Sequence, residues 1–108
     1  MRALTIEVKD SDLILKNLLD NGALLLDVRT NHEFAGFHLP KAYNIRPEEL
    51  SRQINRIKNW KKPIIVYSTY GLRSRLAHHI LEGYGIEVYD ANSQLRVMSL
   101  LQEFNQPK

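Results

Sequence analysis

The chain has 108 residues, of which 44% are hydrophobic and 25% are charged, a composition typical of one globular domain. Fifteen Lys and Arg residues against twelve Asp and Glu give a formal net charge of +3. Because both signs are scattered along the chain, this excess only weakly favours an anionic partner. The chain has no cysteine, which excludes disulfides, thiolate metal sites and a thiol nucleophile.

The sequence carries no signal for a membrane or for export. Its longest apolar runs, residues 23–26 and 64–67, fall far short of the roughly 18 residues that a membrane helix needs. Residues 1–7 become charged too early to hold the apolar core of a signal peptide. We therefore expect a cytoplasmic protein that does not contact a membrane.

Strand-like and helix-like segments alternate from the start of the chain. Residues 4–8 alternate apolar and polar side chains and include β-branched ones, which predicts a strand. A helix is predicted to begin at a cap on Ser11 and to end at Asn21 and Gly22. Residues 23–26 are all apolar, as in a strand that is covered on both faces.

The alternation continues through the middle of the chain. Thr30 and Glu33 have the spacing of a capping box, which opens a short helix ended by Pro40. Residues 42–45 then predict another short strand. Pro47 is suited to the first turn of the helix that follows.

The strongest strand signal is residues 63–67, which lead into a tight loop at 68–73 and then a helix. The apolar side of that helix comprises Leu72, Leu76, Ala77, Ile80 and Leu81. A strand at 86–89 and a helix at 95–104 complete the chain. The pattern predicts one α/β domain over residues 1–108, with about five short, mostly parallel strands flanked by helices on both faces.

The loop at 68–73 is the first candidate for a functional site, because ligands of open α/β sheets bind at the carboxyl ends of the strands. Backbone N–H groups of such a loop can converge on an anion, with the dipole of the next helix behind them. Gly71 allows the tight bend, and Arg73 can close the rim. An ordinary strand-to-helix turn would have the same composition. The predicted anion-binding loop comprises Ser68, Thr69, Tyr70, Gly71, Leu72 and Arg73.

Charged residues elsewhere supply candidate neighbours of this loop. Asp27 ends a predicted buried strand and is expected to accept hydrogen bonds from the next loop. Arg29 is a candidate rim residue or a partner of Glu33, and Arg75 and Arg46 are further candidates for basic charge at the rim.

The remaining polar and aromatic residues predict no metal site and no cofactor. His78 and His79 are neighbours on a helix, so their side chains point about 100° apart and do not chelate a metal. His32 is expected on a solvated surface, and Trp60 is expected to cover the core.

In residues 27–34, 38–45 and 68–74, the sequence resembles the rhodanese (sulfurtransferase) family. Residues 68–74, Ser-Thr-Tyr-Gly-Leu-Arg-Ser, resemble the family's active-site loop Cys-x-x-Gly-x-Arg-Ser. Residues 27–34 resemble its Asp-Val-Arg-x-x-x-Glu-[Phe/Tyr] segment, and residues 38–45 resemble its His-Ile-x-Gly-Ala-x-Asn-[Ile/Leu] segment. The match runs from about residue 23 to residue 88, with the family's order and spacing.

The resemblance implies a rhodanese-like fold in which Ser68 stands at the position of the catalytic cysteine. Ser68 and Arg73 take the family's catalytic positions, whereas Asp27, Glu33 and His38 take structural ones. A serine hydroxyl is a poor nucleophile without an adjacent base, and it cannot carry sulfur as a persulfide. The chain as written is therefore expected to transfer no sulfur.

Other positions also depart from the family pattern. Phe37 and Lys41 stand where the family usually has glycine, and residues 90–94 with Met98 replace its Gly-Gly and a following Trp. The six-residue loop at 68–73 argues against the related phosphatases, whose loop is one residue longer around a catalytic cysteine.

Two functions remain open at this point. The first is a non-catalytic module that binds a small oxyanion, such as thiosulfate, sulfate or phosphate, or a protein partner through the loop at 68–73. The second is a sulfurtransferase whose catalytic cysteine has been replaced by Ser68. A serine hydrolase with His38 as base is remote, since Val66 and Tyr70 occupy the glycine positions of Gly-x-Ser-x-Gly. Nucleic-acid binding is not expected, because no Lys/Arg stripe interleaves with aromatic residues.

Overall fold

Four short strands form one parallel sheet in the computed structural model, which describes residues 2–105 and the side chains of residues 11–102. The strands are β1 (Leu24–Asp27), β2 (Tyr43–Asn44), β3 (Ile64–Ser68) and β4 (Val88–Ser93). Their order across the sheet is β2-β1-β3-β4, and every neighbouring pair is parallel. β3 is buried along its whole length, as expected for the strongest strand signal.

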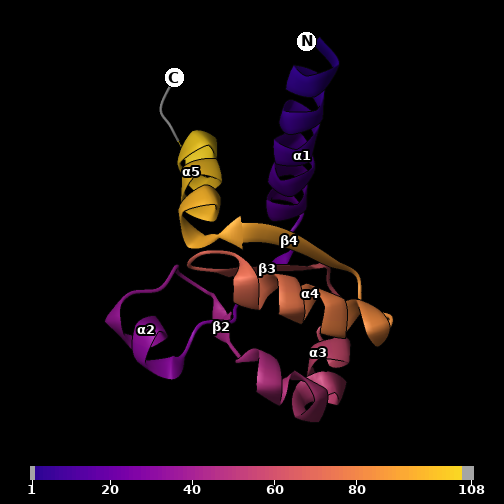
Figure 1. The fold of residues 1–108 in the computed structure, drawn as a ribbon, viewed down its shortest axis with the longest axis vertical. Coiled ribbons are helices and arrows are strands. Elements are labelled where there is room, and N and C mark those ends of the chain that lie inside the picture. Colours follow the sequence, from indigo (N-terminus) through magenta and orange to yellow (C-terminus); the bar gives the residue numbers. More distant parts are fainter. Residues whose placement is uncertain (1, 106–108) are drawn as a thin grey trace.

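Helices cover both faces of this sheet (Figure 1). They are α1 (Arg2–Asp20), α2 (Asn31–Gly36), the 3-10 helix η1 (Pro47–Gln53), α3 (Ile54–Asn59), α4 (Leu72–Gly83) and α5 (Gln94–Asn105). α1 and α5 stand on one face, whereas η1, α3 and α4 pack on the other. The predicted α/β class is confirmed. No helix within residues 2–105 is long and apolar enough to cross a membrane.

The alternation of side chains along β3 divides the core between the two faces. Ile65 and Tyr67 face α1 and α5, whereas Ile64 and Val66 face the opposite helices. The first cluster comprises Leu15, Leu25, Leu39, Ile65, Tyr67, Ala91, Val97 and Leu100. The second comprises Leu26, Val28, Ile45, Leu50, Ile57, Ile64, Val66, Ala77, Leu81 and Val88. Burial on both sides holds the strand ends in fixed positions.

The prediction of a strand at residues 4–8 is wrong, because these residues belong to α1. Ser11, expected to cap a helix, lies inside the same helix. Five residues of alternation are too few to separate a strand from a helix when a strongly helical segment follows directly. The sheet described here therefore has four strands in place of about five.

Two further expectations need correction near the carboxyl end of the sheet. Leu72 and Leu76, expected on the apolar side of α4, are 71% and 51% exposed. The strand expected at 86–89 instead runs from Val88 to Ser93 and is irregular, since Asp90 pairs with Val66 whereas Asn92 pairs with the next residue of β3. This bulge brings Asn92 to the end of the sheet, beside the loop that follows β3.

Candidate functional site

Ser68 is the last residue of β3 and is only 1% exposed. Its Oγ accepts hydrogen bonds from the backbone N–H groups of Gly71, at 3.0 Å, and Ser74, at 3.3 Å. One donor belongs to the loop and the other to the first turn of α4. Two backbone dipoles therefore converge on the side-chain atom at the base of the loop.

Gly71 is required by its backbone angle and by its neighbour. Its φ of +92° lies in the left-handed region, and it directly precedes α4. A Cβ on this residue would lie 1.8 Å from Oδ1 of Asn92, so the asparagine side chain fills the space beside the glycine. Asn92 also binds the helix start, since its carbonyl accepts a hydrogen bond from the Ser74 hydroxyl at 3.3 Å.

Asn92 itself adopts a left-handed φ of +77° at the bulge of β4. Its backbone N–H donates to Oδ1 of Asp90 at 2.8 Å, which stabilises this turn. The sequence identified Asn92 as a departure from the family pattern and not as a site residue. The one sequence feature that could have drawn attention to Asn92 is that Asp90, Asn92 and Ser93 are residue types that favour turns.

Arg73 lies at the edge of the loop and is paired with Glu33. Nη1 of Arg73 is 2.9 Å from Oε1 of Glu33, and its Nη2 donates to Oε2 at 3.2 Å. Thr30 holds the same carboxylate through the predicted capping box, which is present. The hydrogen bond from Arg73 is the main cause that lowers the pKa of Glu33 to about 2. The positive charge of Arg73 is therefore balanced within the molecule.

The sequence suggested that Arg29 pairs with Glu33 or lies at the rim of the loop, and the structure shows neither arrangement. Its side chain lies below the surface, 6% exposed as a residue, in a two-point ion pair with Asp27 whose shorter contact is 2.7 Å. Nη2 also donates to the carbonyl of Phe37 at 2.7 Å and to Oε1 of Gln94 at 3.1 Å. Arg29 thus ties the segment after α2 to the start of α5.

Asp27 accepts the hydrogen bonds expected of it. The backbone N–H of Arg29 donates to Oδ1 at 3.0 Å, in addition to the guanidinium contacts. Asn44, from β2, donates its side-chain amide to the carbonyls of both residues, at 2.9 and 3.0 Å. The end of β1 is therefore fixed by a buried polar network beneath the loop.

His38 does not serve Ser68. Its Nδ1 donates to the carbonyl of Phe34 at 2.8 Å, and its ring stacks on the Phe34 ring with centroids 3.8 Å apart. Within residues 11–102, no side-chain base forms a hydrogen bond with Ser68 Oγ. A serine hydrolase mechanism would lack its general base here.

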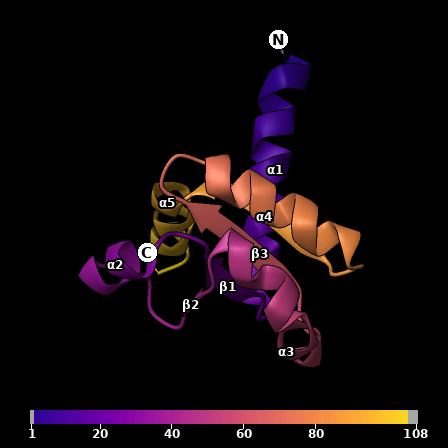
Figure 2. The ribbon, with the colours of Figure 1, turned by 60° about the horizontal axis from the view of Figure 1, so that its bottom comes forward.

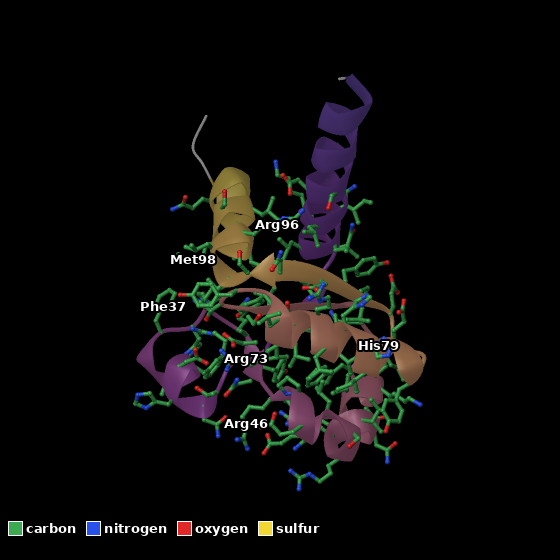
Figure 3. The ribbon with its side chains drawn as sticks, viewed as in Figure 1. Phe37, Arg46, Arg73, His79, Arg96 and Met98 are labelled. Carbon is green, nitrogen blue, oxygen red and sulfur yellow. The ribbon has the colours of Figure 1, made fainter. Side chains whose placement is uncertain are left out.

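The outer surface of the loop is apolar at its tip. Tyr70 is 89% exposed, and together with Leu72 it lines a shallow pocket of about 220 Å³. Arg75 also lines this pocket and forms no ion pair with any residue in the described part of the chain. Arg46 is not part of this surface: it pairs with Glu49 at 2.7 Å, at the start of η1 (Figure 3).

Trp60 covers the core as expected, stacking on Tyr43 with ring centroids 4.4 Å apart. His78 and His79 lie on α4, and His32 is exposed on α2. Of these four residues, none lies in the loop or in the pocket beside it.

The family model for the rhodanese-like domain matches residues 11–93 of the chain. Because this match covers well over half of the residues, the chain belongs to the rhodanese-like domain family. No curated protein sequence matches the chain.

Solved structures share the same fold. Human single-domain sulfurtransferase TSTD1 is 24% identical with a TM-score of 0.62, and the match covers 79% of this chain and 89% of that one. A rhodanese-related protein from Thermoplasma volcanium is 26% identical, with a TM-score of 0.61 over 77% and 80% of the two chains. Reduced Bacillus anthracis CoADR-RHD gives a TM-score of 0.67 at 20% identity, covering 86% of this chain but only 16% of that much longer one.

Proposed function

We propose that this chain is a rhodanese-like module without sulfur-transfer activity, which binds a partner through the loop at 68–73. One observation carries the proposal. Ser68 Oγ lies buried at the point where two backbone N–H groups converge, and the family's cysteine belongs at this position. The loop is intact, whereas the atom that would carry sulfur is absent.

Sulfur transfer is not expected because the side chain at position 68 ends in a hydroxyl oxygen and not in a thiol sulfur. Sulfur transfer needs a nucleophile that ionises near neutral pH and forms a stable bond to a second sulfur. A serine hydroxyl does neither, and it has no base within hydrogen-bond reach among the described residues. We therefore assign the loop to binding.

The charges around the loop support a protein partner over a small anion. Arg73 is neutralised by Glu33, and Arg29 is buried against Asp27. A free oxyanion such as thiosulfate, sulfate or phosphate would meet backbone N–H groups and little unpaired charge, so we expect binding on the order of millimolar. A protein partner would gain the apolar surface at the exposed loop tip and the unpaired Arg75.

Amide chemical shifts of the full chain, titrated with thiosulfate, sulfate and phosphate, test the loop as the binding surface. We expect weak, saturable shifts at residues 69–74, which Arg73→Ala reduces. Arg52→Ala is the matched control, because it removes one exposed guanidinium from η1, away from the loop. Shifts confined to other surfaces, or unchanged in Arg73→Ala, would contradict anion binding at the loop.

A pull-down with the full chain as bait tests the protein partner, with Tyr70→Ser/Leu72→Ser as the loop variant. These two side chains are exposed, so the fold should tolerate their loss. A partner retained by the wild type and lost by the variant supports the proposal. A partner retained equally by both contradicts it.

A sulfurtransferase whose cysteine has been replaced by serine is the second candidate. The observation in its favour is the same convergence of N–H groups on Ser68 Oγ, because such donors would stabilise a thiolate at that position. Substitution of Ser68 by cysteine tests this candidate.

A further inference from the structure

Although charges of both signs are spread over the chain as a whole, one stretch of the sequence carries positive charge alone. Seven of the fifteen Lys and Arg residues lie between Glu49 and Glu82, and this stretch contains no Asp or Glu. Two of the seven belong to the loop and the start of α4. The other five lie on η1, on α3 or directly after α3, and they are Arg52, Arg56, Lys58, Lys61 and Lys62.

A pocket of about 330 Å³ opens beside these residues, at the edge of the sheet opposite the loop. It lies between the end of α3 and the end of α4, ahead of β3 and β4, and Figure 2 shows α3 at the tail of the β3 arrow. We call it the lysine pocket and define it by Ile57, Lys58, Lys61, Lys62, Ile86 and Glu87. Its volume is within the range of sites that hold a side chain or a small ligand.

The lysines of this pocket have no internal counter-charge. Within residues 11–102, the side chains of Lys58, Lys61 and Lys62 form no ion pair and no hydrogen bond. The carboxylate in the lining, Glu87, accepts a hydrogen bond from the Tyr89 hydroxyl at 2.6 Å. The pocket therefore carries an excess of positive charge that faces solvent.

The backbone places Lys58, at the end of α3, and Lys61, just after α3, close together. Lys61 has a left-handed φ of +56°, and its N–H donates to the carbonyl of Lys58 at 3.2 Å, which holds both residues in one turn. Lys62 also lines the pocket, but its Nζ is 3.4 Å from the place where a Cβ on Gly22 would lie, at the end of α1. Lys58 and Lys61 are thus the cations available to a partner.

We propose that the lysine pocket docks an acidic segment of a partner protein. An apolar side chain of that segment packs against the partly exposed Ile86, and flanking carboxylates pair with Lys58 and Lys61. Such pairs at a rim orient the partner and speed its association, and they weaken as salt is added. This surface is separate from the loop, so the module has two binding edges.

The same charges would suit a nucleic acid, but the neighbouring aromatic rings do not. Single strands bind by stacking bases on free aromatic faces along a basic groove. Trp60 is stacked on Tyr43 and packs against the core, and the Arg56 guanidinium lies over both rings at 5.6 Å from each centroid. Trp60 and Tyr43 are therefore not free to stack on bases. The pocket lining offers one exposed aromatic ring, Tyr84, whereas a single strand of nucleic acid needs successive rings, and this favours a protein segment.

The test titrates the full chain with the peptide acetyl-Glu-Glu-Leu-Glu-Glu-amide and follows the backbone amides. We expect shifts at residues 57–62 and 84–87 that diminish with added salt. The variant Lys58→Gln/Lys61→Asn should weaken binding about five- to tenfold, the loss of two exposed charge pairs. Asn is chosen because it tolerates a left-handed backbone. Lys41→Asn is the matched control, since Lys41 is also exposed with a left-handed φ of +66°.

Several results would overturn the proposal. Binding unaffected by Lys58→Gln/Lys61→Asn, or equal binding of acetyl-Gln-Gln-Leu-Gln-Gln-amide, would remove the charge argument. Tighter binding of oligothymidylate at the same salt concentration would assign the surface to nucleic acid. Shifts at residues 69–73 alone would assign the peptide to the loop. Because Arg73→Ala leaves the lysine pocket intact, failure at one edge is distinguishable from failure at the other.

Discussion

Both carboxylate oxygens of Glu33 face the guanidinium of Arg73, at 2.9 Å from Nη1 and 3.2 Å from Nη2. The pair joins α2 to the first turn of α4 through two residues that lie forty positions apart in the sequence. It fixes the side chain of Arg73 at the edge of the loop and balances its charge. The ion pair therefore leaves little unpaired charge on Arg73.

Replacing Glu33 by Gln tests this pair through its pH dependence. The pKa of Glu33 is lowered from 4.5 to about 2 in the folded chain, so its charge stabilises the fold above about pH 4.5. That stability is lost as the pH falls through 2. At pH 7, Glu33→Gln should lower the free energy of unfolding by about 0.5–1 kcal/mol, the range of exposed ion pairs.

Urea unfolding of the wild type and Glu33→Gln at a series of pH values measures this effect. The difference between the two proteins should shrink steadily between pH 4.5 and pH 2. A difference that stays constant to pH 2 would show that the charge of Glu33 does not stabilise the fold.

Gly71→Ala should destabilise the chain by about 2 kcal/mol, from left-handed strain and the clash with Asn92. Asn92→Gly removes the clashing side chain and suits the left-handed φ at that position. In the Asn92→Gly background the cost of Gly71→Ala should fall to about 1 kcal/mol, the strain alone. A double-mutant cycle by urea unfolding measures the difference, and an equal cost in both backgrounds would contradict the close contact.

Arg29→Met should be strongly destabilising, by about 3–5 kcal/mol, because it leaves the fully buried Asp27 carboxylate without its counter-charge. The double variant Asp27→Asn/Arg29→Met removes both charges and should recover part of that loss. The free energy of unfolding of the three proteins checks this order. A double variant less stable than Arg29→Met would mean that the backbone contacts of Asp27 matter more than the charge.

The strands that the sequence predicts well are those buried on both faces. Residues 63–67 form an uninterrupted apolar run, and β3 lies in the middle of the sheet with every residue buried. Residues 4–8 have a short amphipathic pattern that fits either period, and their place in α1 depends on the helix that continues after them. Local patterns alone do not contain that information.

The sequence located the loop at 68–73 from Gly71 and from its position after β3. It did not show which residues of other elements contact the loop. Arg29 lies four residues before Glu33 in the sequence, whereas Arg73 lies forty residues after it. Glu33 nevertheless pairs with Arg73, because α2 packs beside α4. Asn92 comes from a different strand, and the bulge in β4 aims it at Gly71. These relationships are tertiary, so a single sequence carries little sign of them.

The loop at 68–73 matches the rhodanese pattern at Gly71 and Arg73 and differs from it at Ser68. In Ser68→Cys, the N–H groups of Gly71 and Ser74 would point at a sulfur, so the thiol pKa should fall at least about one unit below its usual value of about 8.5. Ser51→Cys supplies the matched control, an exposed thiol on η1 with an ordinary pKa.

Transfer of sulfur from thiosulfate to cyanide, measured for the wild type and for Ser68→Cys, shows whether the cysteine is what the loop lacks for catalysis. In Ser68→Cys the thiolate should attack the outer sulfur of thiosulfate, forming a persulfide while sulfite leaves with the electron pair of the broken S–S bond. Cyanide then removes that sulfur as thiocyanate and restores the thiolate. We expect no transfer above background by the wild type, and partial activity by Ser68→Cys with a mass gain of one sulfur atom. Robust transfer by the wild type, or a Ser68→Cys protein with an ordinary thiol pKa and no persulfide, would contradict this assignment of the loop.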